Sequence, residues 1–457
     1  MGQRPPLGDV LVEEFHVSFS SCRLAGIIAC LSLSLPLSAS AQDPATPPPS
    51  GPEAAPPPED SGLSADDLKD IESALGKDAA TAAQEGTAPA ATAPSSSASG
   101  VTISPTNISF RGLELSFILD VAGAAFSSKE PLQTGGHDPS TPGFNLQQLE
   151  MSVNTAVDPY FRFTGNIVFS QFGVEVEEAY AATTALPANL QLRAGQFLTL
   201  FGRLNPTHPH SWDFVDQPFA LGRVFGGEGN RGLGVEASWL SPLPWFLEVV
   251  GSVTDARGEG TARSFLGSSG EGVSSPLDFQ FTGAVKQFFP LADELSLVWG
   301  LSAADGPTPT GYRNRADVFG TDVYLKYRPL SEGSNTIVAL QGELFYRRRQ
   351  VPQDVLSDLS GYGQLLWRFS QRWAAAGRYE FGTPARGLDG AIADDALDPD
   401  WTANRQRISA NVTFWPTEFS RLRLQAATDL VGWREQPDTS VFLALEVVMG
   451  AHGAHAF

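Results

Sequence analysis

Two alternating segments and the short turn between them read Arg405-Gln406-Arg407-Ile408-Ser409-Ala410-Asn411-Val412-Thr413-Phe414, Trp415-Pro416-Thr417-Glu418-Phe419 and Ser420-Arg421-Leu422-Arg423-Leu424-Gln425-Ala426. From Ile408 on, apolar side chains take every second strand position, and polar or basic side chains lie between them. Because successive side chains of a β-strand point to opposite faces, this period of two predicts two strands that each have one apolar and one polar face. The tight turn between aromatic residues predicts that the two strands form an antiparallel hairpin.

The same period recurs along most of the chain, which predicts sixteen strands. They are expected at 107–127, 143–157, 159–170, 173–185, 189–200, 231–240, 245–255, 277–288, 294–304, 317–328, 335–347, 358–370, 373–382, 403–414, 419–429 and 439–449. A soluble sandwich alternates in the same way, so the connections decide between the two classes.

Short connections alternate with long ones. The turns at 239–245, 288–294, 327–332, 369–373 and 414–419 are short and bracketed by aromatic residues, whereas 256–276, 305–316, 348–358, 383–402 and 430–438 are longer and rich in Gly, Asp, Ser and Pro. This layout is typical of an outer-membrane barrel whose aromatic girdle flanks its periplasmic turns. We therefore expect an all-β fold, a transmembrane antiparallel β-barrel of about sixteen strands over 107–457. Trp245, Trp373 and Trp415 are expected to face lipid beside the turns.

The N-terminal part of the chain predicts export. Arg23 precedes a short apolar run and the small residues Ala39-Ser40-Ala41, an order that predicts a signal peptide at 1–41. Residues 42–106 are rich in Pro and Ala and predict a periplasmic linker, with one short helix expected near 64–76. The expected location is the outer membrane of a Gram-negative cell, with outer-membrane lipid and the barrel-assembly machinery as partners.

Composition excludes several classes of protein. The chain has 51 acidic and 30 basic residues and a net charge of −21, which argues against a nucleic-acid partner. Both cysteines, Cys22 and Cys30, lie within the predicted signal peptide, so cysteine catalysis and cysteine metal sites are not expected in the mature chain. No arrangement of Ser, His and Asp resembles a catalytic triad, so the chain is not expected to be an enzyme or to need a cofactor.

The third long connection, 202–230, is unusually apolar for a loop and contains Trp212, Phe214, Phe219 and Phe225. Such a loop is expected to fold back against the inner wall of the barrel rather than to extend into water. Its charged residues are then predicted to narrow the pore. They are Arg203, Asp213, Asp216 and Arg223.

The segment Arg193-Ala194-Gly195-Gln196-Phe197-Leu198-Thr199-Leu200-Phe201-Gly202, followed by this aromatic and acidic loop, resembles the phosphate-selective porin family. The stretch 191–234 also resembles outer-membrane proteins labelled zinc-regulated receptors or porins, which have a similar Asn-Pro-x-His-Pro-His segment. The resemblance implies a sixteen-stranded porin that assembles as a homotrimer. The chain departs from a phosphate pore in one respect, because it lacks a lysine-rich wall.

Basic residues occupy the polar face of many predicted strands and are expected to line the lumen. They are Arg193, Lys326, Arg328, Arg347, Arg378, Arg405, Arg407, Arg421 and Arg423, and the acids Glu177, Asp322, Glu343, Glu380 and Glu446 alternate with them. Rings of arginine favour anions in a pore. A network of ion pairs that stiffens the wall explains the same pattern, and the sequence leaves both interpretations open.

His208 and His210 are the candidate metal ligands. Two imidazoles separated by one proline, with Asp213 and Asp216 close by in the sequence, offer nitrogen and oxygen donors that suit zinc. Ordinary hydrogen bonding within the loop is the alternative. His452 and His455 form a similar pair but are expected at the opposite end of the barrel.

Together these features predict a porin, an outer-membrane channel for passive diffusion of small hydrophilic solutes, with anions as one candidate class. Two alternatives remain, a receptor for zinc or metal complexes and a structural barrel of the cell envelope. A receptor of the energised kind needs a large ordered plug domain, and 42–106 is too short and too rich in Pro and Ala to form one.

Overall fold

The computed structural model describes residues 102–103, 108–109, 112–170, 173–255, 260–266, 273–311, 313–331 and 334–450. The predicted signal peptide at 1–41, the helix at 64–76, nearly all of the linker at 42–106 and the histidines at 452 and 455 lie outside these residues. Within the described part of the chain, no helix has the length and apolarity needed to cross a membrane.

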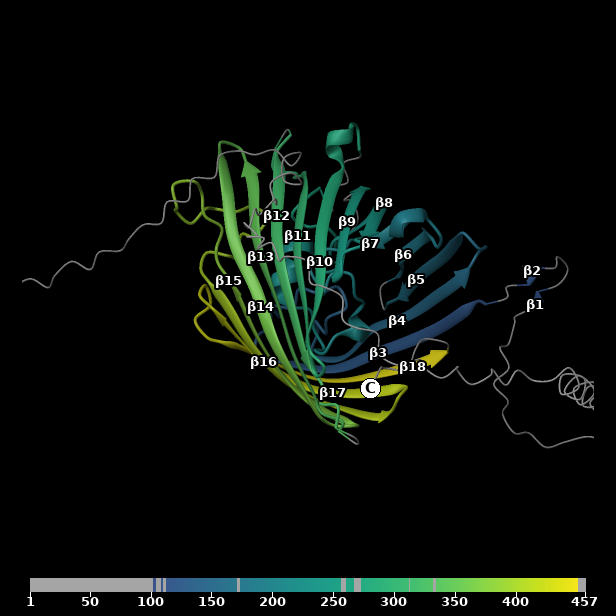
Figure 1. The fold of residues 1–457 in the computed structure, drawn as a ribbon. Coiled ribbons are helices and arrows are strands. Elements are labelled where there is room, and N and C mark those ends of the chain that lie inside the picture. Colours follow the sequence, from purple (N-terminus) through teal and green to yellow (C-terminus); the bar gives the residue numbers. More distant parts are fainter. Residues whose placement is uncertain are drawn as a thin grey trace, which may run out of the picture. The chain divides into compact units, whose positions relative to one another are not determined.

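Sixteen antiparallel strands form a closed barrel (Figure 1). They are β3 (Glu114–Phe126), β4 (Gly143–Ala156), β5 (Phe161–Phe169), β6 (Val174–Thr183), β7 (Leu190–Leu198), β8 (Arg231–Leu240), β9 (Phe246–Asp255), β10 (Gln280–Ala292), β11 (Leu295–Pro307), β12 (Arg315–Tyr327), β13 (Ile337–Val351), β14 (Asp354–Ser370), β15 (Trp373–Gly382), β16 (Arg405–Thr417), β17 (Ser420–Val431) and β18 (Asp438–Gly450). Each pairs with its neighbour in sequence, and β18 pairs with β3 to close the ring. The prediction of a sixteen-stranded antiparallel barrel is confirmed.

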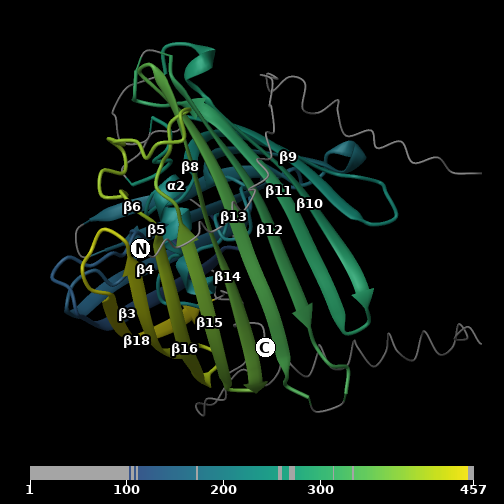
Figure 2. The same cartoon turned by 90° about the vertical axis from the view of Figure 1, so that its left-hand side faces the viewer.

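The remaining elements are short. A two-stranded ladder, β1 (Thr102–Ile103) with β2 (Ile108–Ser109), precedes the barrel. Outside the strands lie the 3-10 turns η2 (Pro187–Asn189), η3 (Pro209–Ser211) and η4 (Pro276–Asp278) and the α-helix α2 (Phe219–Phe225). Helix α2 lies against β13, β14 and β15, and Figure 2 shows it beside the long strand β13.

The tight turns and the long loops lie at opposite ends of the barrel, as predicted. We call the end with the turns 293–294, 371–372 and 418–419 the turn end, and the other end the loop end. One expected loop, at 348–358, is instead a strand-to-strand turn of only residues 352 and 353. The physical reason is that β13 continues to alternate through Arg347, Arg348 and Arg349, with the first and third buried on the inner side.

The two faces of the wall differ as the alternation requires. On β17, Leu424 is 56% exposed on the outer face, whereas its neighbours Arg423 and Gln425 are 3% and 0% exposed on the inner face. An outer surface of this kind suits hydrocarbon, which cannot hydrogen-bond to polar groups.

The expected girdle is correct for Trp373, which is exposed on the outer face beside the turn at 371–372. It is wrong for Trp415. Along β16, Trp415 is two residues beyond Thr413 and four beyond Asn411, both buried on the inner face, so the alternation places it on the same face. The Arg368 guanidinium also lies over its ring, 4.4 Å from the ring centroid. Trp415 therefore belongs to the inner wall.

Replacing Leu424 by Arg tests the strand phase. Leu424 lies near the middle of β17, so a charge there should cost about 2–4 kcal/mol of unfolding free energy, while Leu430→Arg near the loop end of the same strand should cost about 0–1 kcal/mol. The measurement is reversible urea unfolding of the barrel in lipid vesicles. Equal costs at the two positions would contradict the outward orientation of Leu424 in the membrane.

Candidate functional site

Loop 3, the connection 199–230 between β7 and β8, folds into the barrel. Its apolar side chains Phe201, Phe219, Val224 and Phe225 are fully buried. They form a cluster that includes residues of the inner wall, namely Ala304 of β11, Ala316 and Val318 of β12, Phe345 of β13 and Tyr362 of β14. The predicted inward fold of the loop is confirmed, and burial of its aromatic residues is the physical cause.

The same loop also reaches β3 and β18, on another part of the ring. Val215 packs in a second cluster with Ala122 and Ala124 of β3 and with Phe442 and Ala444 of β18. Trp212 and Phe214 meanwhile accept hydrogen bonds at their carbonyl oxygens from Arg423 of β17, at 3.1 and 2.8 Å. Loop 3 therefore crosses the inside of the barrel instead of following one side of it.

Asp216 is the main ionic anchor of loop 3. Its carboxylate pairs with Arg378 of β15 at 2.6 Å and also with Arg407 of β16, and it accepts a hydrogen bond from Gln425 at 2.7 Å. Burial alone would raise the pKa of Asp216, but the positive charges of Arg407 and Arg378 outweigh that effect and lower it below its ordinary value. Asp216 is 1% exposed, so its charge is enclosed by the wall arginines.

Arg223, on α2, is enclosed in a second ionic cluster. Its Nε donates to Asp398 at 3.1 Å, and its guanidinium lies 3.6 Å from the ring centroid of Trp401. Both partners belong to the β15–β16 loop (383–404), and Asp398 also pairs with Arg347 of β13. The pKa of Asp398 is lowered because these arginine charges outweigh its burial. At 1% exposure, Arg223 binds two loops together and does not face open solvent.

Arg203 and Asp213, the other two predicted constriction residues, remain partly exposed. Arg203 lies over the ring of Tyr324 at 3.7 Å and donates from Nε to Gln341 at 3.3 Å. Asp213 accepts from Gln364 at 2.9 Å, and burial raises its pKa even though nearby arginines act in the opposite direction. Of the four predicted constriction residues, these two keep some exposure, and they lie beside β12, β13 and β14.

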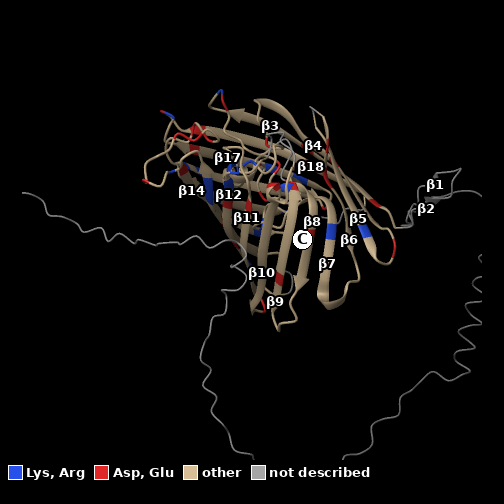
Figure 3. Cartoon of the chain, turned by 90° about the horizontal axis from the view of Figure 1, so that it is seen from above, with Lys and Arg blue, Asp and Glu red and all other residues tan. Residues whose placement is uncertain are grey.

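Most of the predicted lumen-lining cations are ion-paired, and Figure 3 shows basic and acidic residues gathered inside the ring of strands. Seven of the nine have a carboxylate partner: Arg193 with Glu236, Arg347 with Asp358 and Asp398, Arg378 with Asp216 and Glu380, Arg405 with Asp429, Arg407 with Asp216 and Asp429, and Arg421 and Arg423 with Glu446. The ion-pair interpretation of the wall is therefore observed for these residues. Lys326 and Arg328, near the turn end, have no ion-pair partner among the residues that the structure describes.

His208 and His210 bind glutamates of the wall, not the aspartates that follow them. His208 Nδ1 lies 2.9 Å from Glu177 Oε2, and its Nε2 lies 2.9 Å from Glu178 Oε2. His210 Nδ1 lies 3.0 Å from Glu150 Oε2, and the two imidazole rings stack at 5.8 Å. Asp213 and Asp216 are engaged elsewhere, as described above. The acidic groups beside His208 and His210 are therefore Glu150, Glu177 and Glu178, and metal binding by the two histidines stays a prediction.

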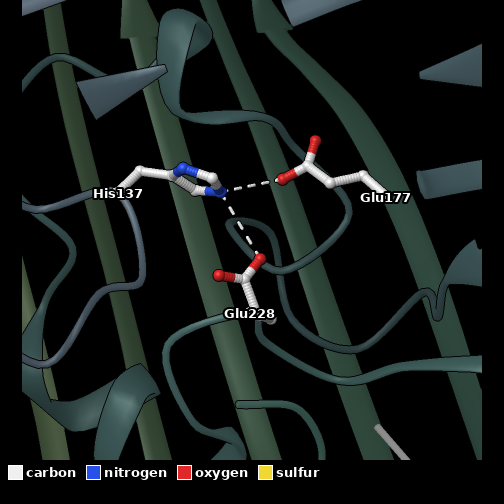
Figure 4. Close-up of side chains that lie close together, drawn as sticks. All are labelled: His137, Glu177 and Glu228. Carbon is white, nitrogen blue, oxygen red and sulfur yellow. Dashed lines mark hydrogen bonds and ion pairs between the residues drawn. The ribbon is translucent and has the colours of Figure 1, made fainter. Parts of the chain in front are cut away.

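A third histidine joins this group from loop 1, the connection 127–142. His137 Nε2 lies 3.1 Å from Glu177 Oε1 and 3.4 Å from Glu228 Oε2 (Figure 4). Burial alone would lower the pKa of His137 and of His208, but hydrogen bonds and charge from the adjacent glutamates raise both pKa values well above the ordinary value. We call the residues Glu150, Glu177, Glu178, Glu228, His137, His208 and His210 the histidine–glutamate cluster.

Sequence reasoning missed His137, Glu150, Glu178 and Glu228 as parts of this cluster. Glu177 and Glu178 offered the available signal, because two adjacent acids in an alternating strand cannot both face inward without an irregularity. The structure has that irregularity, a register shift in which Asn166 pairs with Glu178 and Ile167 with Val176. Such a β-bulge turns one extra side chain toward the same face.

Comparison with known proteins supports the fold. No family model matches the chain. Among solved structures, the outer membrane channel DcaP of Acinetobacter baumannii is 12% identical, with a TM-score of 0.52 over 74% of this chain and 97% of that one. OprB of Pseudomonas putida is 11% identical, with a TM-score of 0.50 over 74% of this chain and 94% of that one. At these identities the likeness shows the fold, an outer-membrane β-barrel.

A sequence relative lies much nearer. A protein of Aquifex aeolicus (strain VF5), described as an uncharacterized protein, is 32% identical over 343 residues, which cover 69% of this chain and 70% of the relative. The chain belongs to the same protein family as this Aquifex aeolicus protein, and its barrel has the fold of outer-membrane channels.

Proposed function

We propose that the protein is a porin, an outer-membrane channel for passive, non-catalytic diffusion of small hydrophilic solutes. A closed barrel with an apolar outer face and a polar inner face is the architecture that allows water and solutes to cross a bilayer. Export through the predicted signal peptide at 1–41 is part of the proposal.

One observation carries the proposal. Loop 3 crosses the barrel but leaves Arg203 and Asp213 partly exposed beside the inner wall. Charged side chains at the narrowest part of a pore set which ions pass. A barrel that served only as a structural wall would have no need to keep a cation and a carboxylate partly exposed at such a position.

We further propose a preference for anions. The paired arginines contribute little, because their charges are neutralised at short distance by buried carboxylates. Lys326 and Arg328 have no such partner among the described residues and lie near the turn end of β12. The resemblance to phosphate-selective porins supports the same preference, and it also supports a homotrimer, which chemical cross-linking in isolated outer membranes would reveal as a three-subunit species.

A structural envelope barrel is the second candidate, and the packing of loop 3 favours it. The loop touches β11 to β14 as well as β3 and β18, and the β15–β16 loop covers α2 through Trp401 and Asp398. A barrel filled in this way could be closed to solutes. Single-channel recording distinguishes the two functions, because a closed barrel gives no conductance steps.

Changing one partly exposed charge of loop 3 at a time tests the porin proposal. In planar bilayers under a salt gradient, Arg203→Gln should move the reversal potential toward cation preference, and Asp213→Asn should move it toward anion preference. Arg372→Gln is the matched control, since Arg372 is exposed in the turn between β14 and β15 and lies outside the proposed constriction. Absence of conductance in the parent protein, or equal shifts in the control, would contradict the proposal.

Releasing the ionic anchor of loop 3 should alter the pore. Asp216→Asn removes one carboxylate from Arg378, which keeps Glu380, and from Arg407, which keeps Asp429, so the cost should stay below about 3–5 kcal/mol, the cost of an unpaired buried charge. We expect the loop to detach in part, which should raise the mean conductance and its fluctuation and make the loop sensitive to added protease. Asp158→Asn, in the short β4–β5 turn, is the control. An unchanged current trace and unchanged protease resistance would show that the anchor does not hold the loop.

A further inference from the structure

We propose that His137, Glu177 and Glu228 bind a divalent transition-metal ion of the zinc class. The three residues come from three separate segments, loop 1, strand β6 and the end of loop 3, so their meeting depends on the folded barrel. The proposal rests on these side chains and does not depend on whether the protein conducts solutes.

The distances already approach those of a metal site. His137 Nε2 lies 3.1 Å from Glu177 Oε1 and 3.4 Å from Glu228 Oε2, and all three donor atoms lie within 4.8 Å of one another. In a tetrahedral zinc site with bonds of about 2.0–2.1 Å, donor atoms are about 3.3 Å apart. An ion between them therefore requires only small side-chain movements (Figure 4).

A second set of three donors adjoins the first. Glu150, Glu177 and His208 also place one donor atom each within 4.8 Å of one another. The two oxygens of Glu177 point to different histidines, Oε1 to His137 and Oε2 to His208. His208 thus lies behind Glu177 and orients its carboxylate toward the first set, as partners behind metal ligands commonly do.

Two β-bulges build the cluster. The bulge in β6 turns both Glu177 and Glu178 inward, and a second register shift, in β4, places both Gln147 and Gln148 on the inner side. Gln147 then holds His137, because its Nε2 donates to the His137 carbonyl oxygen at 2.9 Å. Bulges are concentrated at sites where a strand must re-aim a side chain for function.

The negative charge of the glutamates in the cluster favours binding of a cation. Four glutamates are largely buried here: Glu150, Glu177, Glu178 and Glu228. Among the described residues, arginine pairs with them once, in the ion pair of Arg231 with Glu228 at 3.7 Å. Burying carboxylates without compensating positive charge is costly. Without metal, protons on the histidines supply the compensating positive charge. With metal, a divalent ion bound to neutral imidazole supplies it.

The site also has room and access. A small cavity of about 30 Å³ is lined by His137, Glu177, His208 and Glu228, so a water molecule can complete the coordination. Gly136 makes the approach of Glu228 feasible, because a Cβ atom at that position would lie 1.9 Å from Glu228 Oε1. A bound ion would tie loop 1 and loop 3 to strand β6.

Zinc binding to the refolded, tag-free barrel tests the proposal. Equilibrium dialysis against zinc, with metal counted by mass spectrometry, should find one ion per chain in the parent protein. His137→Ala and Glu177→Gln should each raise the dissociation constant at least about tenfold, since each removes a ligand. Gly136→Ala should weaken binding as well, because it displaces Glu228 without removing a donor. X-ray absorption of the zinc-loaded parent should show only nitrogen and oxygen neighbours at about 2.0–2.1 Å.

His210→Gln is the matched control and should bind zinc as the parent does. His210 belongs to the cluster but to neither set of three donors. Heat-dependent migration on gels verifies that every variant forms the barrel. A folded parent that binds no zinc, or a folded His137→Ala variant that binds as tightly as the parent, would overturn the proposal. Loss of binding in His208→Ala alone would place the metal in the adjoining set and would equally overturn the assignment to His137. None of these results depends on conductance, so the porin proposal stands or fails separately.

Discussion

The pairing of β18 with β3 is the contact on which the rest of the structure depends. Hydrocarbon offers no partner to a backbone N–H or C=O group, so a sheet can span a membrane only if no edge is left open. Eleven residue pairs, from Ser440 with Phe126 to Gly450 with Ser116, join the last strand to the first. Once the ring is closed, every strand must present apolar side chains outward, and its polar side chains are forced inward.

That inward-facing polar wall creates a second requirement. Arginines such as Arg378 and Arg407 stand on the inner face and need compensating charge wherever water is excluded. Loop 3 supplies part of it through Asp216, and the β15–β16 loop supplies more through Asp398. In return, the wall satisfies backbone groups of the loop, as when Glu380 accepts from the Phe219 N–H at 2.6 Å. The inner wall and loop 3 thus form one network of ion pairs and hydrogen bonds, and a substitution in either should alter the contacts of both.

The sequence predicted the barrel well, because strand number and turn position depend on local features. Period-two alternation and turns bracketed by aromatics lie within about ten residues of one another, so the hairpin of β16 and β17 could be recognised from a single stretch. The direction of loop 3 was also predictable from its apolar composition. Trp415 was assigned to the wrong face, because aromatic character near a turn does not reveal the phase of the strand.

The details of the site were not predictable for a different reason. Glu177 lies 31 residues from His208 and 40 residues from His137, and Asp216 lies 191 residues from Arg407. No local pattern connects residues so far apart, and the β-bulge that turns Glu178 inward breaks the rule used to assign faces. Asp216 and Arg223 were recognised as charges of the loop, but their burial depends on partners that only the closed barrel brings near.

The attachments of loop 3 also differ in chemical character from one side of the barrel to the other. Toward β15 and β16 the loop is held by Arg378 and Arg407, and a guanidinium stays charged at every pH that a cell encounters. Toward β4 and β6 it is held by His208 against Glu177 and Glu178 and by His210 against Glu150, and the ordinary pKa of an imidazole, unlike that of a guanidinium, lies within the pH range of a cell. The two sides of loop 3 therefore differ in the cation that meets the carboxylates, which is a guanidinium toward β15 and β16 and an imidazole toward β4 and β6.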